Sequence, residues 1–258
     1  MLSSQRVLLH QAVANEALEV VDLAEVEILD SWQAQIRPEH TALVLVDLQN
    51  DFVHPDGWVA EQQIPGYLGD TGISVVHERA AALLGAARAA NVPIVFVRMI
   101  GDEKYLSPPM QAQYLRNHRH PRPTCVQEGT WGADFFGDLR PNGQGLEFLI
   151  DKHRYSACIG TRLDQVLRSN KIKTIVVSGV ATSGCVESTI RDAFMLDYYV
   201  VVVGDACGDY DQDRHRAALT KMDLSFGYVV DVADVERVWT SQLAPLGQGS
   251  SSIPRYDQ

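Results

Sequence analysis

The stretch KTIVVSGVATSGCVESTIRDAF, residues 173–194, decides the fold. It begins with a β-branched apolar run and ends in a helical pattern, and small residues surround Cys185 at the junction. A strand that passes through a tight turn into a helix is the repeating unit of α/β proteins. The stretch therefore predicts a buried parallel strand with a cysteine at its carboxyl end.

Similar short apolar runs recur along the chain, at 41–47, 92–98, 146–151, 198–206 and, more weakly, 227–232. Helical patterns lie between or after them, at 72–91, 161–170, 185–197 and 211–223. Nearly continuous apolar runs are typical of strands that are buried on both faces, and their alternation with helices favours right-handed crossovers. We predict a three-layer α-β-α fold of the Rossmann-like kind, with a mostly parallel six-stranded sheet.

The domain organisation follows from the same pattern. Residues 39–245 form the predicted main domain, preceded by an N-terminal arm at 1–38 and followed by a flexible tail at 246–258. A long segment rich in Pro, Gly and His, 99–145, interrupts the alternation. We expect this insertion to act as a lid or as a contact between subunits.

Composition excludes several classes of protein. The chain has 258 residues and a formal net charge of −11, which argues against general binding to nucleic acid or to an anionic membrane. No apolar run is long enough to span a bilayer, and the first residues lack a secretory signal pattern. One basic segment, RNHRHPRP at 116–123, predicts a surface or subunit contact or, alternatively, a lid that attracts an anionic substrate.

Cysteine usage points to a reducing compartment. The four cysteines are widely spaced and form no CxxC pair, so a disulfide framework or a zinc knuckle is not expected. We predict a cytoplasmic protein in which one thiol reacts and the others pack as small apolar residues.

Reactive side chains follow three of the predicted strands. Asp47, Lys152 and Cys185 each come directly after a strand or its turn, and the carboxyl ends of parallel strands meet at one edge of the sheet. Alone, each residue has an ordinary structural interpretation, but an acid, an amine and a thiol at one edge favour catalysis. We expect the helix end behind Cys185 to favour the thiolate. Asp205, after the fifth run, is interpreted as structural.

Four segments carry a resemblance to a known family. They are VLVDLQNDF (44–52), DKHRYSA (151–157), GTRLDQVLR (160–168) and SGVATSGCVESTIRDAF (178–194). In their order and spacing the chain resembles the isochorismatase-like cysteine hydrolases over roughly residues 38–232. Within that family it looks most similar to the ureidoacrylate and related carbamoyl amidohydrolases.

The resemblance implies a catalytic triad of Asp47, Lys152 and Cys185. It also implies a cis peptide between Val180 and Ala181, which directs the N–H groups of Ala181 and Cys185 into an oxyanion hole. The implied reaction is attack of the cysteine on an amide or ureido carbonyl, followed by hydrolysis of the covalent intermediate. Gly184 is expected to leave space for that carbonyl.

The resemblance also bears on metals and substrate. Family members that bind a metal carry an Asp–x–His segment after the second strand, where this chain reads VRMIGDEKYL, and His54 is interpreted as a loop residue. We therefore expect no metal and no cofactor. The apolar Met99 and Ile100 in that segment leave open a larger, more apolar acyl group. A nicotinamidase-like amidase, a redox-sensing thiol protein and a non-catalytic binding scaffold stay as alternatives.

Four further residues are predicted to contact the substrate: Phe52, Tyr155, Trp131 and Val180. Trp131 lies in the insertion, so a subunit contact is the alternative for it. The expected partners are a small amide or ureide and further copies of the chain in a homodimer or homotetramer.

Overall fold

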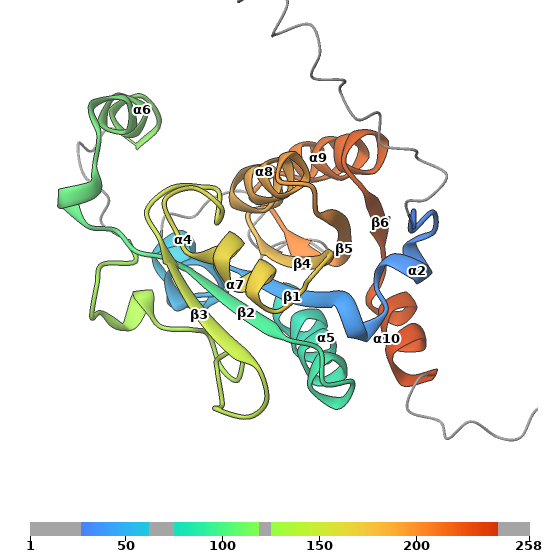
Figure 1. The fold of residues 1–258 in the computed structure, drawn as a ribbon. Helices are drawn as coiled ribbons and strands as arrows, with labels where there is room; N and C mark the ends of the chain where they lie inside the picture. The colour runs from blue at the N-terminus through green and yellow to red at the C-terminus, as the bar shows by residue number, and fades with distance from the viewer. Residues whose placement is uncertain (1–26, 62–74, 119–124, 242–258) are drawn as a thin grey trace, which may run out of the picture. The chain divides into compact units, whose positions relative to one another are not determined.

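The computed structural model describes residues 27–61, 75–118 and 125–241, and the chain divides into two compact units, Met1–Asp30 and Ser31–Gln258. The larger unit holds a six-stranded sheet in which every neighbouring pair is parallel (Figure 1). The strands are β1 (Thr41–Val46), β2 (Ile94–Met99), β3 (Glu147–Lys152), β4 (Thr174–Val180), β5 (Tyr199–Gly208) and β6 (Tyr228–Val230). The predicted fold class is confirmed.

The strand order β3-β2-β1-β4-β5-β6 sets the place of the site. The chain starts in the middle with β1, builds outward to β3, and then returns to the other side of β1 with β4. The carboxyl ends of β1 and β4 therefore lie next to each other where the order reverses. This is the crevice in which open α/β sheets bind ligands.

Helices cover both faces of the sheet, which gives the three predicted layers (Figure 1). One face packs against α5 (Val76–Ala89) and α10 (Val232–Ser241), and the other packs against α7 (Leu163–Ser169), α8 (Glu187–Met195) and α9 (Gln212–Ser225). Side chains of a strand alternate between these faces: Leu43 and Leu45 belong to the first cluster, Ala42 and Val44 to the second. Both faces are buried, which explains the continuous apolar runs in the sequence.

The region of the predicted N-terminal arm, 1–38, crosses the boundary between the two units. Its last part holds α2 (Trp32–Gln35), and Ile36 is fully buried in the core of the larger unit. The Trp239 indole N–H donates to the Ile36 carbonyl over 2.7 Å. Residues 1–26 and the predicted tail at 246–258 lie outside the described residues.

Helix α10 is absent from the sequence prediction, which placed a strand over 227–232. Strand β6 ends at Val230, and the apolar pattern that continues beyond it belongs to the buried face of the helix, with Val232, Val235 and Trp239 in the core. The Asp205 carboxylate accepts a hydrogen bond from the Val232 N–H over 2.9 Å. This contact at the start of α10 confirms the structural interpretation of Asp205.

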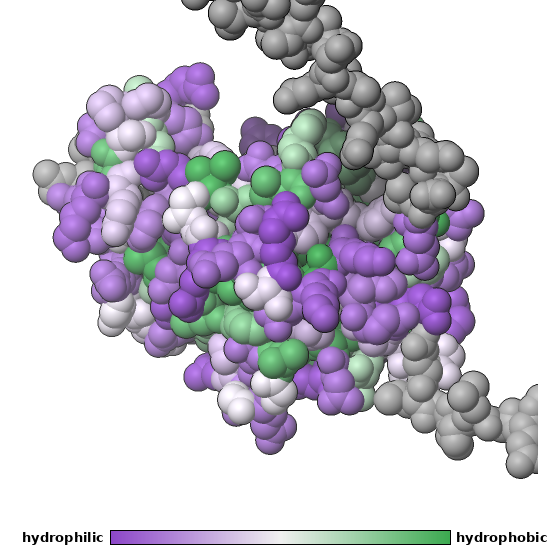
Figure 2. All heavy atoms as spheres, viewed as in Figure 1, coloured by the Kyte–Doolittle hydropathy of each residue, from purple (hydrophilic) through white to green (hydrophobic). Residues whose placement is uncertain are grey.

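The insertion 99–145 contains the short helices η4 (Glu103–Tyr105) and η5 (Trp131–Ala133) and the longer α6 (Pro108–His118). Figure 1 shows α6 standing apart from the helices that cover the sheet. Among the described residues, no helix combines the length and apolarity that crossing a membrane requires. In the face shown in Figure 2, hydrophilic residues are spread widely, with hydrophobic ones between them.

Candidate active site

An ion pair between Asp47 and Lys152 lies at the centre of the crevice. The Lys152 Nζ donates to Asp47 Oδ2 over 2.7 Å and to the Arg154 carbonyl over 3.2 Å, and the two side chains of the pair are 1% or less exposed. Asp47 follows β1 with a positive φ of 56°, a backbone conformation that is uncommon for a residue with a side chain. The chain therefore turns sharply at the strand end and holds the carboxylate inside the protein.

Cys185 reaches the same place from β4. The peptide between Val180 and Ala181 is cis, and the chain then makes one π-helical turn, η6 (Thr182–Val186), before α8 begins. Gly179 has a φ of 135°, and a Cβ there would lie 2.0 Å from the Val46 carbonyl oxygen. Only glycine allows the two strand ends to come so close. At Gly184 a Cβ would meet nothing nearer than 3.8 Å, so that side of the turn is open as predicted.

The three side chains interact through their charges. Burial raises the pKa of the Asp47 carboxyl, and the positive charge of Lys152 opposes this shift. Burial alone would lower the pKa of Lys152, but the negative charge of Asp47 leaves it above its usual range. The lysine is therefore an ammonium whose charge favours the carboxylate form of Asp47.

The expectation that the helix end favours a Cys185 thiolate is wrong. Burial raises the pKa of this thiol, and the negative charge of Asp47 raises it further, while Lys152 lowers it. The cysteine lies inside the π-helical turn and not at the open start of α8, so burial outweighs any helix dipole. The sulfur accordingly rests as a thiol, and a base would have to take its proton for it to act as a nucleophile.

Asp209 is a site residue that the sequence prediction missed. Its Oδ2 accepts from the Ser183 N–H over 2.6 Å and its Oδ1 from the Tyr210 N–H over 2.8 Å. Strand β5 continues to Gly208 after a register shift against β4, so the acid at its end is Asp209 and not Asp205. The repeated Gly–Asp in GDACGDY was the available signal.

A buried histidine supports the same turn from α9. The Thr182 hydroxyl and the His215 Nδ1 are 2.9 Å apart, and both side chains are buried. Burial lowers the pKa of His215, so the folded protein holds the ring neutral. This residue positions the turn and does not line the cavity.

We expect the free energy of unfolding to fall as the pH falls below about 6.5, the ordinary histidine pKa. Because the folded-state pKa of His215 is depressed, the unfolded chain takes up the proton first, so this destabilisation begins at 6.5 and increases toward the folded pKa. Melting temperatures between pH 8 and 5.5 would show a shallower loss in His215→Gln than in the wild type. The loop variant His54→Gln is the control, and equal slopes in all three proteins would contradict the assignment.

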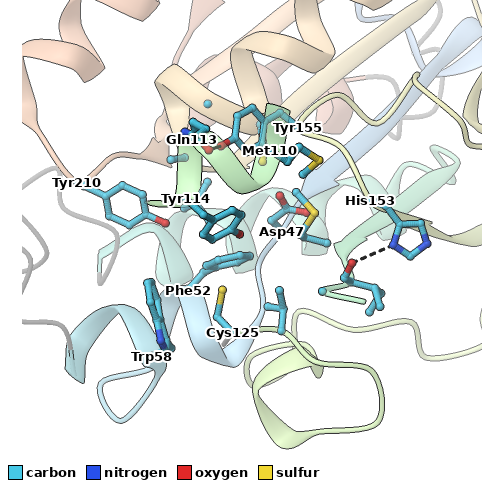
Figure 3. Close-up of a pocket in the computed structure, with 18 of the residues that line it drawn as sticks. Asp47, Phe52, Trp58, Met110, Gln113, Tyr114, Cys125, His153, Tyr155 and Tyr210 are labelled. Atoms are coloured by element: carbon cyan, nitrogen blue, oxygen red, sulfur yellow. Dashed lines mark hydrogen bonds between the residues drawn. The ribbon is translucent and has the colours of Figure 1, made fainter. Parts of the chain in front are cut away.

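The side chains of Asp47 and Cys185 open into a cavity of about 700 Å³. It is lined from the ends of β1 to β5 and from the insertion, and Figure 3 shows Asp47 beside the aromatic side chains that surround the space. The residues that line it include Asp47, Phe52, Trp58, Met99, Asp102, Tyr105, Met110, Gln113, Tyr114, Arg116, Cys125, His153, Tyr155, Val180, Ala181, Cys185, Asp209, Tyr210 and Arg214. Lys152 lies behind Asp47 and is fully buried.

The segment after Asp47 fastens the insertion to the sheet. The buried Gln49 amide accepts from the Met99 N–H over 2.8 Å and donates to the carbonyls of Met99 and Ala133, each over 2.9 Å. Asp51 accepts from the Val126 N–H over 2.5 Å. The insertion thereby becomes one wall of the cavity; its roles as a lid and as a subunit contact stay predictions.

The structure places three of the four predicted substrate contacts on the cavity. Phe52, Tyr155 and Val180 line it, and the Tyr155 hydroxyl donates to the Gln113 amide oxygen of α6 over 3.2 Å. Trp131 is not part of the lining. Its half-exposed ring packs edge-on against the His54 ring, with centroids 4.9 Å apart. His54 is therefore a packed loop residue, as interpreted.

Two further predictions concern charge and metal. Of the basic segment 116–123, only Arg116–His118 lies within the described residues, and Arg116 lines the cavity. Across all the described residues (27–61, 75–118 and 125–241), no cluster of three or more His, Cys, Asp or Glu has a geometry that could hold a metal ion.

Comparison with known proteins agrees with this geometry. Residues 41–234 match the family model described as the isochorismatase domain. The chain is 32% identical to the ureidoacrylate amidohydrolase RutB of Acinetobacter baylyi, covering 76% of this chain and 82% of that protein. It is also 32% identical to the RutB of Pseudomonas savastanoi pv. phaseolicola, over 84% and 89% of the two chains. A solved cysteine hydrolase from Pseudomonas syringae pv. phaseolicola superposes with a TM-score of 0.68 at 30% identity, over 83% and 98%.

Proposed function

The chain belongs to the isochorismatase family, and on this premise we propose that it is a cysteine-dependent amidohydrolase. Its substrate is a small amide or N-carbamoyl compound, of which it cleaves the C–N bond. One observation carries the proposal: the Cys185 thiol, which follows β4, lies beside the buried ion pair of Asp47, which follows β1, and Lys152, which ends β3. The relatives named as ureidoacrylate amidohydrolases support a ureide as the substrate class.

In the first half of the reaction, the Cys185 sulfur attacks the carbonyl carbon while its proton passes to Asp47. The raised pKa of the thiol makes this transfer necessary, and the charge of Lys152 keeps Asp47 able to accept. The N–H groups of Ala181 and Cys185 are the donors that we assign to the developing oxyanion. Asp47 then gives its proton to the leaving nitrogen, the C–N bond of the tetrahedral intermediate breaks, and ammonia or an amine departs, leaving a thioester or thiocarbamate on Cys185.

In the second half, water attacks the covalent intermediate. Asp47 removes a proton from this water and returns it to the departing sulfur, so the thiol is regenerated and the acid product is released. A ureide yields carbamic acid, which decomposes to ammonia and carbon dioxide. No step in this scheme calls on a metal ion.

The direct test of the proposal is ammonia release. The purified protein is incubated with a panel of linear amides and N-carbamoyl compounds, ureidoacrylate included, and ammonia is measured against time. We expect turnover of at least one member of the panel, and a failure to turn over any of them would contradict the proposed function.

Dialysis against EDTA is expected to leave this activity unchanged, because a thiol, a carboxylate and an ammonium supply every proton transfer. The rates are compared before dialysis, after it, and after readdition of zinc. A loss of activity that zinc restores would refute the metal-independent mechanism.

A further inference from the structure

We propose that the cavity selects an amide or ureide that carries an aromatic ring or a group of similar bulk. The inference rests on the proposed function, because it concerns the substrate of the same reacting centre. It adds which chemical group of the substrate occupies the space beyond the reacting carbonyl.

The cavity is large enough to hold a substrate with a bulky substituent. A volume of about 700 Å³ lies within the range of roughly 300–1,000 Å³ that is typical of pockets for drug-sized ligands. A short-chain ureido acid would leave much of this space to water. A bulkier substituent would fill it and would expel water from the apolar walls.

The walls of the cavity carry several aromatic rings. Six aromatic residues line the cavity: Phe52, Trp58, Tyr105, Tyr114, Tyr155 and Tyr210. Figure 3 shows that separate segments of the chain bring these rings around the space next to Asp47, among them the labelled Phe52, Tyr114 and Tyr210. Aromatic rings prefer offset or edge-to-face contacts with another ring, and the thioethers of Met99 and Met110 can adapt to its edge.

Several polar side chains of the lining already have partners within the protein. Asp209 accepts from two backbone N–H groups, and Asp102 accepts from the Lys104 Nζ and N–H over 3.0 and 2.9 Å. The Gln113 amide oxygen is engaged by Tyr155, and the His153 Nδ1 lies 2.9 Å from the Ile100 carbonyl (Figure 3). Recognition of the part of the substrate that does not react therefore falls mainly to the rings.

The exposed Arg116 and Arg214 also line the cavity, so a carboxylate on the substrate would find a positive charge there. The test must hold this contribution constant. N-carbamoylphenylalanine and N-carbamoylalanine carry the same carboxylate and differ by one phenyl ring. The neutral pair 3-phenylpropionamide and propionamide repeats the comparison without a carboxylate.

We expect kcat/KM to be about 10- to 100-fold higher for the phenyl member of the pair that is hydrolysed, the gain typical of burying a ring of this size. Tyr114→Leu should reduce this ratio at least about threefold, because it removes one ring from the wall. Trp131→Leu is the matched control: it removes an aromatic ring outside the cavity, and its ratio should equal that of the wild type.

A ratio near one in both pairs, or an unchanged ratio in Tyr114→Leu, would overturn the proposed selectivity. Equal hydrolysis of both members, abolished in Cys185→Ala, would leave the proposed function intact while removing the inference. A wild-type protein that releases no ammonia from any of the four compounds or from the wider panel overturns both.

Discussion

Replacing Cys185 with alanine is expected to abolish ammonia release, with a loss in kcat of about 10⁴-fold or more, the scale seen when a covalent nucleophile is removed. The Asp47 and Lys152 side chains cannot take over the covalent step, because they are held in a buried ion pair. The measurement is kcat on the best substrate of the panel. Iodoacetamide should inactivate the wild type and label Cys185, faster with substrate absent than present.

Cys158→Ala is the matched control for this experiment. Cys158 is a free, half-buried cysteine that does not line the cavity, so its removal should change kcat by less than about twofold. Far-UV circular dichroism and the melting temperature show whether each variant is folded. Retention of most of the activity by a folded Cys185→Ala would reject the mechanism, and would return the redox-sensing and binding alternatives to consideration.

The sheet and the meeting of Asp47, Lys152 and Cys185 at its edge could be predicted from the sequence for one physical reason. Strands buried on both faces must be apolar throughout, so β1 and β4 are visible as runs, and the residue that ends each run is visible as well. The coarse order of strands and helices was then enough to bring Asp47, Lys152 and Cys185 to one edge. No detailed knowledge of side-chain conformation was needed.

Other features depend on contacts between distant segments, and local patterns do not encode these. Asp209 was missed because the end of β5 is set by its pairing with β4, which shifts register between Val177 and Gly179. The thiolate expectation was wrong because burial of Cys185 is a tertiary property. Trp131 looked like a cavity wall by composition, yet the backbone of η5 directs it toward His54.

The composition of the cavity walls also depends on contacts between distant segments, which local sequence patterns do not encode. Tyr114 and Tyr210 lie almost a hundred residues apart, and they line one cavity only because α6 is brought over the strand ends by the Gln49 and Asp51 contacts. An aromatic residue in a loop is equally compatible with a surface contact. The sequence therefore predicts the three side chains at the sheet edge far better than the cavity walls around them.

Lys152→Met is expected to lower the free energy of unfolding by about 3–5 kcal/mol, because it leaves the Asp47 carboxylate buried without its counter-ion. Asp47→Asn should be similarly destabilising, since the ammonium then lacks its 2.7 Å partner. The double variant removes both charges and should recover much of the loss. Urea unfolding of the four proteins gives the coupling free energy of the pair, and strict additivity of the two single losses would contradict it.

The same variants separate stability from catalysis. Burial already raises the pKa of Asp47, and without Lys152 the shift increases, so the folded Lys152→Met binds a proton that the unfolded chain has lost. Its free energy of unfolding should therefore decline as the pH rises above about 4, the ordinary aspartate pKa. The double variant has no such dependence and recovers stability, yet it must stay inactive, because an asparagine cannot accept the proton of Cys185. If the double variant regained activity along with stability, the buried pair would be a structural element and the base would have to be sought elsewhere.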